Sequence, residues 1–179
     1  YLMMNKPSGV LSASEDRGGA VTAADLVAGE YAHYRVSPAG RLDKDSEGFL
    51  ILANDGDYIH QVISPAKHVS KRYFCSLEHE ISEADIAAFE NGILLADGFL
   101  CRPAVLERGV PGRDAPGPSA FVTIQEGKFH QVKRMFAARA NKVLALKRVR
   151  IGGVCLDASL APGEYREMTE EEKERIIHE

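Results

Sequence analysis

Apolar and polar residues follow one another along this chain in short runs that predict both strands and helices. The continuous apolar run "FLILAN" at residues 49–54 is typical of a strand covered on both faces. In "SKRYFCSLEHE" the period is two, which places Tyr73, Cys75 and Leu77 on one face of a strand. Further strands are predicted at residues 1–5 and within "RPAVLER", "AFVTIQE", "KVLALKRVRI", "VCL" and "PGEYREM".

Capping residues and apolar spacing predict the helices. Thr22 precedes "AADLVAGE", and Ser82 precedes "EADIAAFEN", which ends at Gly92 in the C-cap position. "DGDYIHQVIS" stops before Pro65, and "TEEEKERIIHE" has an acidic first turn that suits the helix dipole. "GKFHQVKRMFAARAN" is a further helix. Strands and helices mix without strict βαβ alternation, so we expect an α+β protein with a largely antiparallel sheet.

Size and composition narrow the class of protein. The 179 residues, 45% of them apolar, suit one domain or two small lobes sharing a core, and exclude wholesale disorder. No run approaches the roughly 20 apolar residues of a membrane helix, and no signal peptide is visible. Cys75, Cys101 and Cys155 form no CxxC pair, so we expect no structural zinc site or disulfide framework and a reducing cytoplasm as the compartment. Each lies among apolar residues, so we expect all three to be buried and inert.

The net charge of −4 hides a segregated basic block. Between Lys128 and Arg150 the chain has eight Lys and Arg residues and no Asp or Glu. Such a block can mark a surface that binds a polyanion such as RNA, although a solvated helix face would show the same pattern.

The stretch "GRLDKDSEGFLILANDG" at residues 40–56 allows two interpretations. Counted from Asp43, it places acidic residues and a Gly where a calcium loop has them, but Asn54 stands where the loop needs a bidentate Glu. The alternative is a turn before a buried strand, in which Arg41 and Asp43 project to the same side. The neighbouring guanidinium would keep Asp43 ionised, as a nucleophile or base requires, or the two would form a surface ion pair.

The motifs along the chain match one family in order. They are "NKPSG" (5–9), "GRLDKDSEGFLILANDG" (40–56), "KRY" (71–73), "EGKFHQVKRM" (126–135) and "LKRVRIGGVCLDASLAPGEYREMTEEE" (146–172). On these motifs the chain resembles the bacterial ribosomal-RNA pseudouridine synthases of the RsuA type over essentially its whole length. Phe49 and Ala53 depart from the family's commonest Leu and Thr, at positions expected to pack.

This resemblance implies a fold and a reaction. The fold is the pseudouridine synthase fold, a mixed, mostly antiparallel sheet with flanking helices and a central RNA-binding cleft. It would form one catalytic domain over residues 1–179, with two lobes sharing one sheet, and an upstream RNA-binding domain common in the family would be absent from this chain. In the reaction, a uridine is detached at its glycosidic nitrogen, turned and rejoined through carbon 5. The product is an isomer, so no cofactor is needed.

The resemblance also assigns roles to residues. Asp43, Tyr73 and Lys133 would be catalytic, with Asp43 as the essential carboxylate that attacks C1′ or removes a proton at C2′. Tyr73 would lie against the flipped uracil. Arg41 would fill the space that the flipped base leaves, since extruding a base costs a few kcal/mol. Lys71, on the same strand face as Tyr73, would reach phosphate or support Tyr73.

A helical wheel bears on the basic block. If Phe129, Val132, Phe136 and Ala140 mark the apolar centre of the helix, Lys133 lies roughly 60–70° from it, where it could pair with Asp43. His130 is an RNA contact or a plain surface histidine. The full set of further expected RNA contacts is Lys128, His130, Gln131, Arg134, Arg139, Lys147, Arg148 and Arg150.

Details within the motifs predict the substrate. "EGKFHQVKRMFAA" and "LDASLAPGEYREMT" look most like the enzyme of small-subunit (16S) ribosomal RNA. The alternatives are a large-subunit (23S) enzyme and a non-catalytic RNA-binding or ribosome-assembly module. In each case we expect ribosomal RNA as the partner of a cytoplasmic monomer, without a metal site or a membrane.

Overall fold

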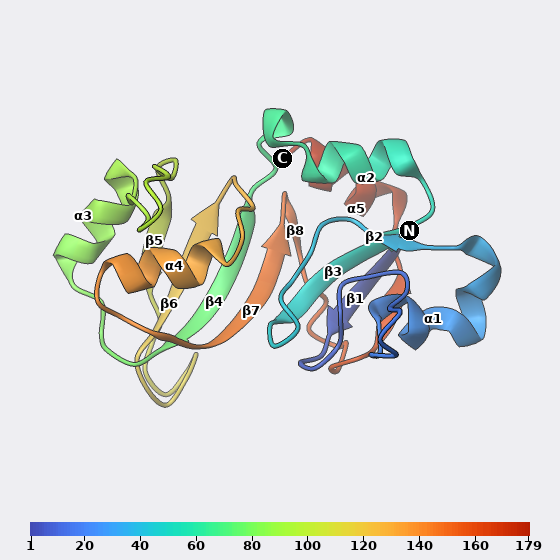
Figure 1. Cartoon of the computed structure of the whole chain (residues 1–179), viewed down its shortest axis with the longest axis horizontal. Helices are drawn as coiled ribbons and strands as arrows, with labels where there is room; N and C mark the ends of the chain where they lie inside the picture. Colours follow the sequence, from blue (N-terminus) through green and yellow to red (C-terminus); the bar gives the residue numbers. More distant parts are fainter. The chain divides into compact units, whose positions relative to one another are not determined.

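The computed structural model describes residues 1–179, and its contacts divide the chain into two compact units. The first unit comprises Tyr1–Val69 and Arg148–Glu179, and the second comprises Ser70–Lys147. Both units contain strands and helices, and the strand pairing is mixed and mostly antiparallel (Figure 1). The prediction of an α+β protein is therefore confirmed.

The first unit is built around strand β3 (Glu47–Ala53), in which every residue after Glu47 is buried. Strand β1 (Leu2–Lys6) pairs with it antiparallel, from Leu2 opposite Leu52 to Lys6 opposite Gly48. The other strands of this unit are β2 (Ser37–Pro38) against β3, β9 (Tyr165–Glu167) against β1, and β8 (Val154–Cys155) against the end of β7 (Val143–Ile151).

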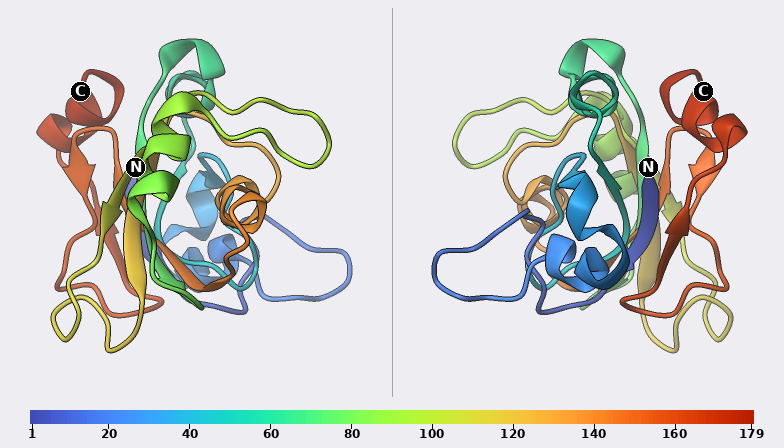
Figure 2. Two further views of the ribbon diagram at one scale, coloured as in Figure 1. Left: turned by 90° about the vertical axis from the view of Figure 1, so that its left-hand side faces the viewer. Right: turned by 90° about the vertical axis from the view of Figure 1, so that its right-hand side faces the viewer.

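The first unit also contains three α-helices, α1 (Ala23–Tyr31), α2 (Gly56–Ile63) and α5 (Glu170–Ile177). Two short 3-10 helices, Ala32–Tyr34 and Pro65–Lys67, follow α1 and α2. Helices α2 and α5 lie side by side (Figure 1), and their Val62 and Ile176 join Met3, Phe49 and Ile51 of the strands in one hydrophobic cluster. The chain between β1 and α1 projects from this unit as a long loop (Figure 2).

The second unit contains the antiparallel strands β4 (Lys71–Leu77), β6 (Ser119–Ile124) and β5 (Val105–Arg108). Strand β4 buries Tyr73, Cys75 and Leu77, as its period of two predicts. Helices α3 (Glu83–Asn91) and α4 (Gln131–Ala138) contact each other through Phe89 and Phe136, whose ring centroids are 5.1 Å apart.

Local signals for helix ends are confirmed. Thr22 and Ser82 each accept a hydrogen bond from the backbone of the third helical residue, whose carboxylate in turn accepts from the cap's own N–H. These reciprocal bonds satisfy two backbone donors that an uncapped helix would leave without partners. No helix of the protein is long and apolar enough to cross a membrane.

Two expectations about packing are wrong. Cys155 is exposed, because β8 is a short strand whose alternation turns Val154 inward and Cys155 outward. Helix α4 begins at Gln131, so Phe129 lies before it, and Ala140 lies beyond its end with a φ of 56°. Neither residue belongs to the apolar face of α4, which is formed by Val132, Met135 and Phe136.

Candidate active site

Asp43 lies in the loop between β2 and β3 of the first unit. The chain exposes Arg41, buries Leu42 and leaves Asp43 half-buried. The carbonyl of Asp43 accepts a 3.0 Å hydrogen bond from the Ser46 N–H, which closes a turn directly before β3. The interpretation of this stretch as a turn before a buried strand is confirmed. No group of three or more His, Cys, Asp or Glu side chains that could hold a metal ion is present.

A buried lysine holds this loop in place. Lys6, the last residue of β1, is 0% exposed, and its ammonium donates to the carbonyls of Pro7 (2.8 Å), Val10 (2.7 Å) and Lys44 (3.2 Å). These three acceptors match the three donors of an ammonium group. Burial lowers the pKa of Lys6 to about 8, against the opposing effect of nearby carboxylates that include Asp43. The Lys of "NKPSG" therefore fastens the residue that follows Asp43.

A second contact fastens the residue before Asp43. The Ser12 hydroxyl donates to the Leu42 carbonyl (3.0 Å), and the Leu42 N–H donates back to it (2.9 Å). In addition, the Gly9 N–H donates to the Lys44 carbonyl (2.8 Å). The chain is thus held on both sides of Asp43 by residues 6–12. Sequence reasoning assigned no role to Lys6 or Ser12, although a lysine at the end of an apolar strand was a visible signal.

Arg148 is packed inside the first unit, which corrects its prediction as a phosphate contact. It is 3% exposed, and its Nε donates to the Phe49 carbonyl at 2.7 Å. A Cβ atom on Gly48 would lie 2.2 Å from the Arg148 carbonyl oxygen, so only glycine permits this approach of β7 to β3. The arginine that looked like part of a basic surface instead supports the strand that follows the Asp43 loop.

Tyr73 and Lys71 lie on β4 of the second unit. Tyr73 stands opposite Val122 of β6, and its side chain shares a face with Cys75 and Leu77. Tyr73 is 8% exposed, and Lys71 is half-buried at the start of the strand. Both therefore project from a rigid strand that is paired along its length.

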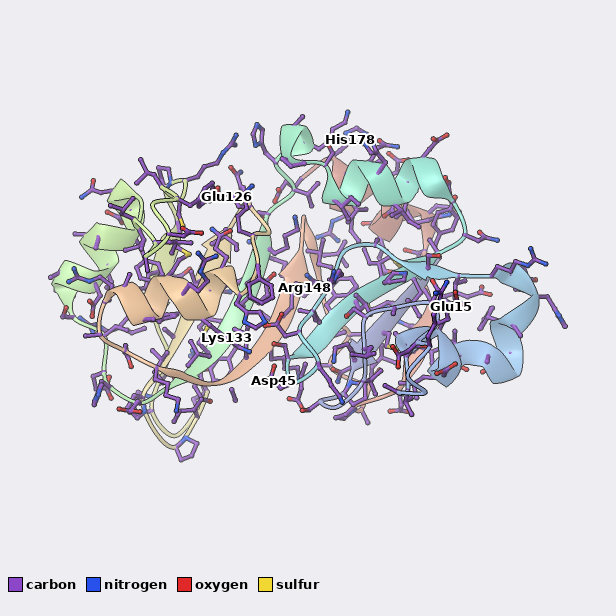
Figure 3. All side chains as sticks on the ribbon, in the orientation of Figure 1. Glu15, Asp45, Glu126, Lys133, Arg148 and His178 are labelled. Atoms are coloured by element: carbon purple, nitrogen blue, oxygen red, sulfur yellow. The ribbon has the colours of Figure 1, made fainter.

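Lys133 lies in the first turn of α4, also in the second unit (Figure 3). Relative to the observed apolar face of Val132, Met135 and Phe136, it falls roughly 110° away on a 100°-per-residue wheel. The predicted angle of 60–70° was wrong because it relied on Phe129 and Ala140. Lys133 is half-buried on the flank of the helix.

Gln131, the first residue of α4, is buried, which corrects its prediction as an RNA contact. Its side-chain oxygen accepts from the Lys128 N–H (3.1 Å), and its amide nitrogen donates to Glu126 (3.1 Å). Both ends of the amide make hydrogen bonds within the loop "EGKFHQ", so Gln131 stabilises the loop.

Several cations of the acid-free block are neutralised by acids from distant segments. Arg134 pairs with Asp97 at 2.6 Å, and Arg139 pairs with Asp85 at 2.8 Å. The pKa of Asp97 is held below its usual value mainly by a hydrogen bond from the Phe99 N–H, and also by the hydrogen bond from Arg134. The block is therefore basic in sequence, but in the folded protein part of its positive charge is neutralised. The ion pair of Arg139 with Asp85 also connects α4 to α3.

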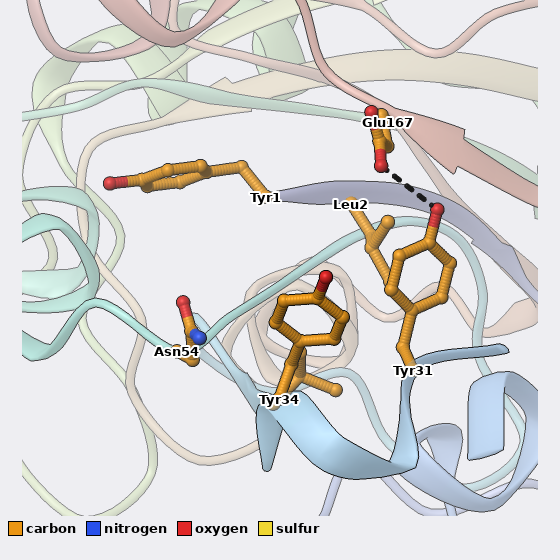
Figure 4. A pocket seen from close by; sticks show the side chains of 7 residues that line it. Tyr1, Leu2, Tyr31, Tyr34, Asn54 and Glu167 are labelled. Atoms are coloured by element: carbon orange, nitrogen blue, oxygen red, sulfur yellow. Dashed lines mark hydrogen bonds between the residues drawn. The ribbon is translucent and has the colours of Figure 1, made fainter.

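A separate pocket of about 250 Å³ lies in the first unit, at the end of β3 opposite to the Asp43 loop. Figure 4 shows its three tyrosine rings, with the Tyr31 hydroxyl donating to Glu167 at 3.0 Å. That hydrogen bond raises the pKa of Tyr31. No sequence pattern predicted this pocket, because its lining comes from residues 1, 2, 31, 34, 36, 54 and 167.

Comparison with known proteins identifies the class to which this fold and these motifs belong. The model of the RNA pseudouridylate synthase family matches residues 1–138, a span that includes Asp43, Tyr73 and Lys133. The chain belongs to this family and is a pseudouridine synthase. The predictions of the family, the fold and the enzyme class are thus confirmed.

Individual relatives agree with this assignment. The chain is 50% identical to an uncharacterized RNA pseudouridine synthase of Bacillus subtilis, over 96% of this chain and 71% of that protein. It is 40% identical to ribosomal small subunit pseudouridine synthase A of Escherichia coli, over 99% of this chain and 74% of that protein.

Solved structures agree as well. A crystal structure of a pseudouridylate synthase superposes with a TM-score of 0.88 at 39% identity, over 98% of this chain and 72% of that one. The archaeal box H/ACA Nop10–Cbf5 complex matches at a TM-score of 0.56 and 16% identity, over 90% of this chain and 50% of that one, which shows a shared fold.

Proposed function

We propose that this enzyme isomerises one uridine of ribosomal RNA, and that its substrate is the 16S RNA of the small subunit. The similarity to ribosomal small subunit pseudouridine synthase A carries the proposal. It extends over 99% of the chain for the Escherichia coli protein, and a Vibrio cholerae protein of the same name is 43% identical over 96% of the chain. A ribosomal substrate also supports a cytoplasmic location for the enzyme, which we expect to act as a monomer with residues 1–179 as its catalytic domain.

Asp43 is the essential carboxylate in this proposal. It acts on the ribose, either at C1′ or at the C2′ proton, so that the bond from C1′ to N1 of uracil breaks. A bond from C1′ to C5 then forms as Asp43 either releases C1′ or returns the C2′ proton. C5 loses its proton and N1 gains one, so that atoms balance without a cofactor. The contacts of Lys6 and Ser12 on both sides of Asp43 support this role, because they hold the backbone that carries the carboxylate before substrate arrives.

Tyr73 and Lys133 contribute from the second unit. Tyr73 lies against the extruded uracil and assists proton transfer at C5. Lys133 supplies a positive charge that stabilises negative charge developing in the reaction. All three residues fall within the span that the family model matches, and each stands on a well-defined element or a fastened loop.

The RNA backbone is bound by exposed or half-buried cations. Arg41 is exposed in the loop of Asp43, where its guanidinium can occupy the place of an extruded base. Lys71, Lys128, Lys147 and Arg150 contact phosphates, with His130 beside them at the start of α4. Arg134 and Arg150 contribute where RNA displaces their carboxylate partners, Asp97 at 2.6 Å and Glu179 at 3.6 Å.

The test is the Asp43→Asn enzyme, with Asp45→Asn as its matched control in the same loop. Asp43→Asn should form no pseudouridine in 16S RNA but bind that RNA nearly as the unaltered enzyme does, because only the reactive carboxylate is lost. Asp45→Asn should remain active. Turnover of Asp43→Asn near the unaltered rate would refute the catalytic assignment.

The substrate is tested separately, by mapping pseudouridine in ribosomal RNA from a strain that lacks the protein. Loss of one 16S pseudouridine is the expected result. Loss of a 23S pseudouridine instead would make the protein a large-subunit enzyme and leave the role of Asp43 intact.

A further inference from the structure

Phe129 is the most exposed large hydrophobic residue of the chain, with 74% of its surface accessible. Its ring stacks on the imidazole of His130, with centroids 3.9 Å apart and planes at 14°. Burial of a phenylalanine normally stabilises a protein by about 1.5–3 kcal/mol. The exposed Phe129 does not contribute this stabilisation, and the stack leaves the second face of its ring in solvent.

The stacked pair is held rigidly. His130 has left-handed backbone angles, φ 47° and ψ 36°, which are unfavourable for a residue with a side chain. Three contacts maintain them: the Lys128 N–H donates to the Gln131 side chain, the Gln131 N–H donates to the Lys128 carbonyl, and Arg134 donates to the Phe129 carbonyl, each at 3.1 Å. The two rings are therefore ordered before any ligand binds, which lowers the entropic cost of binding.

The charges around the pair suit a polyanion. Lys128 precedes it and Lys133 follows it, whereas Arg134 is already paired with Asp97 at 2.6 Å. A flat ring beside cations is the arrangement by which proteins bind unpaired RNA, with the base on the ring and the phosphate on the cation. Apolar protein surfaces fit this position less well, because Phe129 stands without other large apolar side chains from its own loop.

We propose that Phe129 and His130 form a stacking platform for one unpaired base of the RNA substrate. The platform lies at the start of α4, within about one helical turn of Lys133, so the base that it binds is a close neighbour of the target uridine. Any of the four bases fits, since each has a π-face. This inference rests on the proposed function for the kind of RNA, but the stacking itself does not depend on which ribosomal RNA is modified.

The test compares Phe129→Ala, Phe129→Leu and Phe129→Trp with Leu144→Ala. Leu144 is 60% exposed on β7 in the same unit and serves as the matched control for loss of an exposed apolar side chain. Affinity is measured by fluorescence anisotropy with a 16S RNA fragment and with a single-stranded oligouridylate. Thermal unfolding of each variant should match that of the unaltered protein, because the Phe129 ring is exposed.

Phe129→Ala and Phe129→Leu should each weaken binding of both RNAs by roughly 5- to 150-fold. Phe129→Trp should retain the affinity, and Leu144→Ala should have no effect. A fluorescent 2-aminopurine placed beside the target uridine should be quenched on binding, and this quenching should disappear with Phe129→Ala.

Equal affinities of Phe129→Ala and the unaltered protein would overturn the platform. So would full affinity of Phe129→Leu, which would indicate an apolar contact without stacking. If the enzyme forms no pseudouridine in 16S RNA but Phe129→Ala still weakens oligouridylate binding, the proposed substrate fails and the platform stands.

Discussion

Replacing Lys6 by Met should loosen the Asp43 loop and destabilise the protein. Methionine fills a similar volume but donates no hydrogen bond. The carbonyls of Pro7 and Val10 would lose the Lys6 ammonium as donor, whereas the Lys44 carbonyl would keep the Gly9 N–H. A buried acceptor without a partner costs about 1–3 kcal/mol, so two of them predict a loss of about 2–6 kcal/mol.

Urea unfolding at pH 7 measures this loss, and single-turnover formation of pseudouridine measures the effect on Asp43. Lys44→Ala is the matched control, because it removes an exposed lysine side chain and leaves the backbone carbonyl that Lys6 binds. We expect Lys6→Met to slow the chemical step under conditions in which the variant is fully folded. A stability loss below 1 kcal/mol together with an unchanged single-turnover rate would refute the role of Lys6 in holding the loop.

Two further predictions concern charge. Folding lowers the pKa of Lys6 from 10.5 to about 8, so the unfolded chain binds more protons than the folded protein between these pH values. The stability of the unaltered protein relative to Lys6→Met should therefore rise with pH across this window, by up to about 3 kcal/mol. A flat difference in unfolding free energy from pH 8 to 10.5 would contradict the burial of a charged ammonium. Arg150→Ala should weaken RNA binding and reduce the slope of log affinity against log salt by about 0.7–0.9. Arg148→Ala should leave that slope unchanged and lower the midpoint of thermal unfolding, because Arg148 is buried against Phe49. The reverse pattern would show that Arg148 reaches phosphate.

The acid-free basic block shows why a sequence pattern can mislead about a surface. Within the block, Arg134 and Arg139 have no acidic neighbour in sequence, yet each pairs with an aspartate 37 or more positions away along the chain. A count of charges along a segment contains no information about which distant segment folds beside it. The same limit explains Arg148, whose burial depends on the approach of β7 to Gly48.

The start of α4 shows the limit of periodicity. Phe129 has the spacing of a core residue with Val132 and Phe136, and a wheel drawn through the whole motif therefore placed it in the core. The helix begins two residues later, because the side chain of Gln131 bonds back to Lys128 and His130 adopts left-handed angles. Amino-acid spacing predicts which residues would share a helix face, but not where the helix begins.

The sequence by itself determined the α+β class, the strands of Phe49 and Tyr73, the capped helices and the family that carries Asp43. These follow from periodicity, from capping bonds between residues three apart, and from ordered motifs, all of which act over short stretches of chain. Only the tertiary structure decided which cations are neutralised, that Lys6 and Ser12 hold the Asp43 loop, and that Phe129 is exposed. Those outcomes depend on burial and on hydrogen bonds between segments far apart in sequence, and such pairings exist only once the chain has folded.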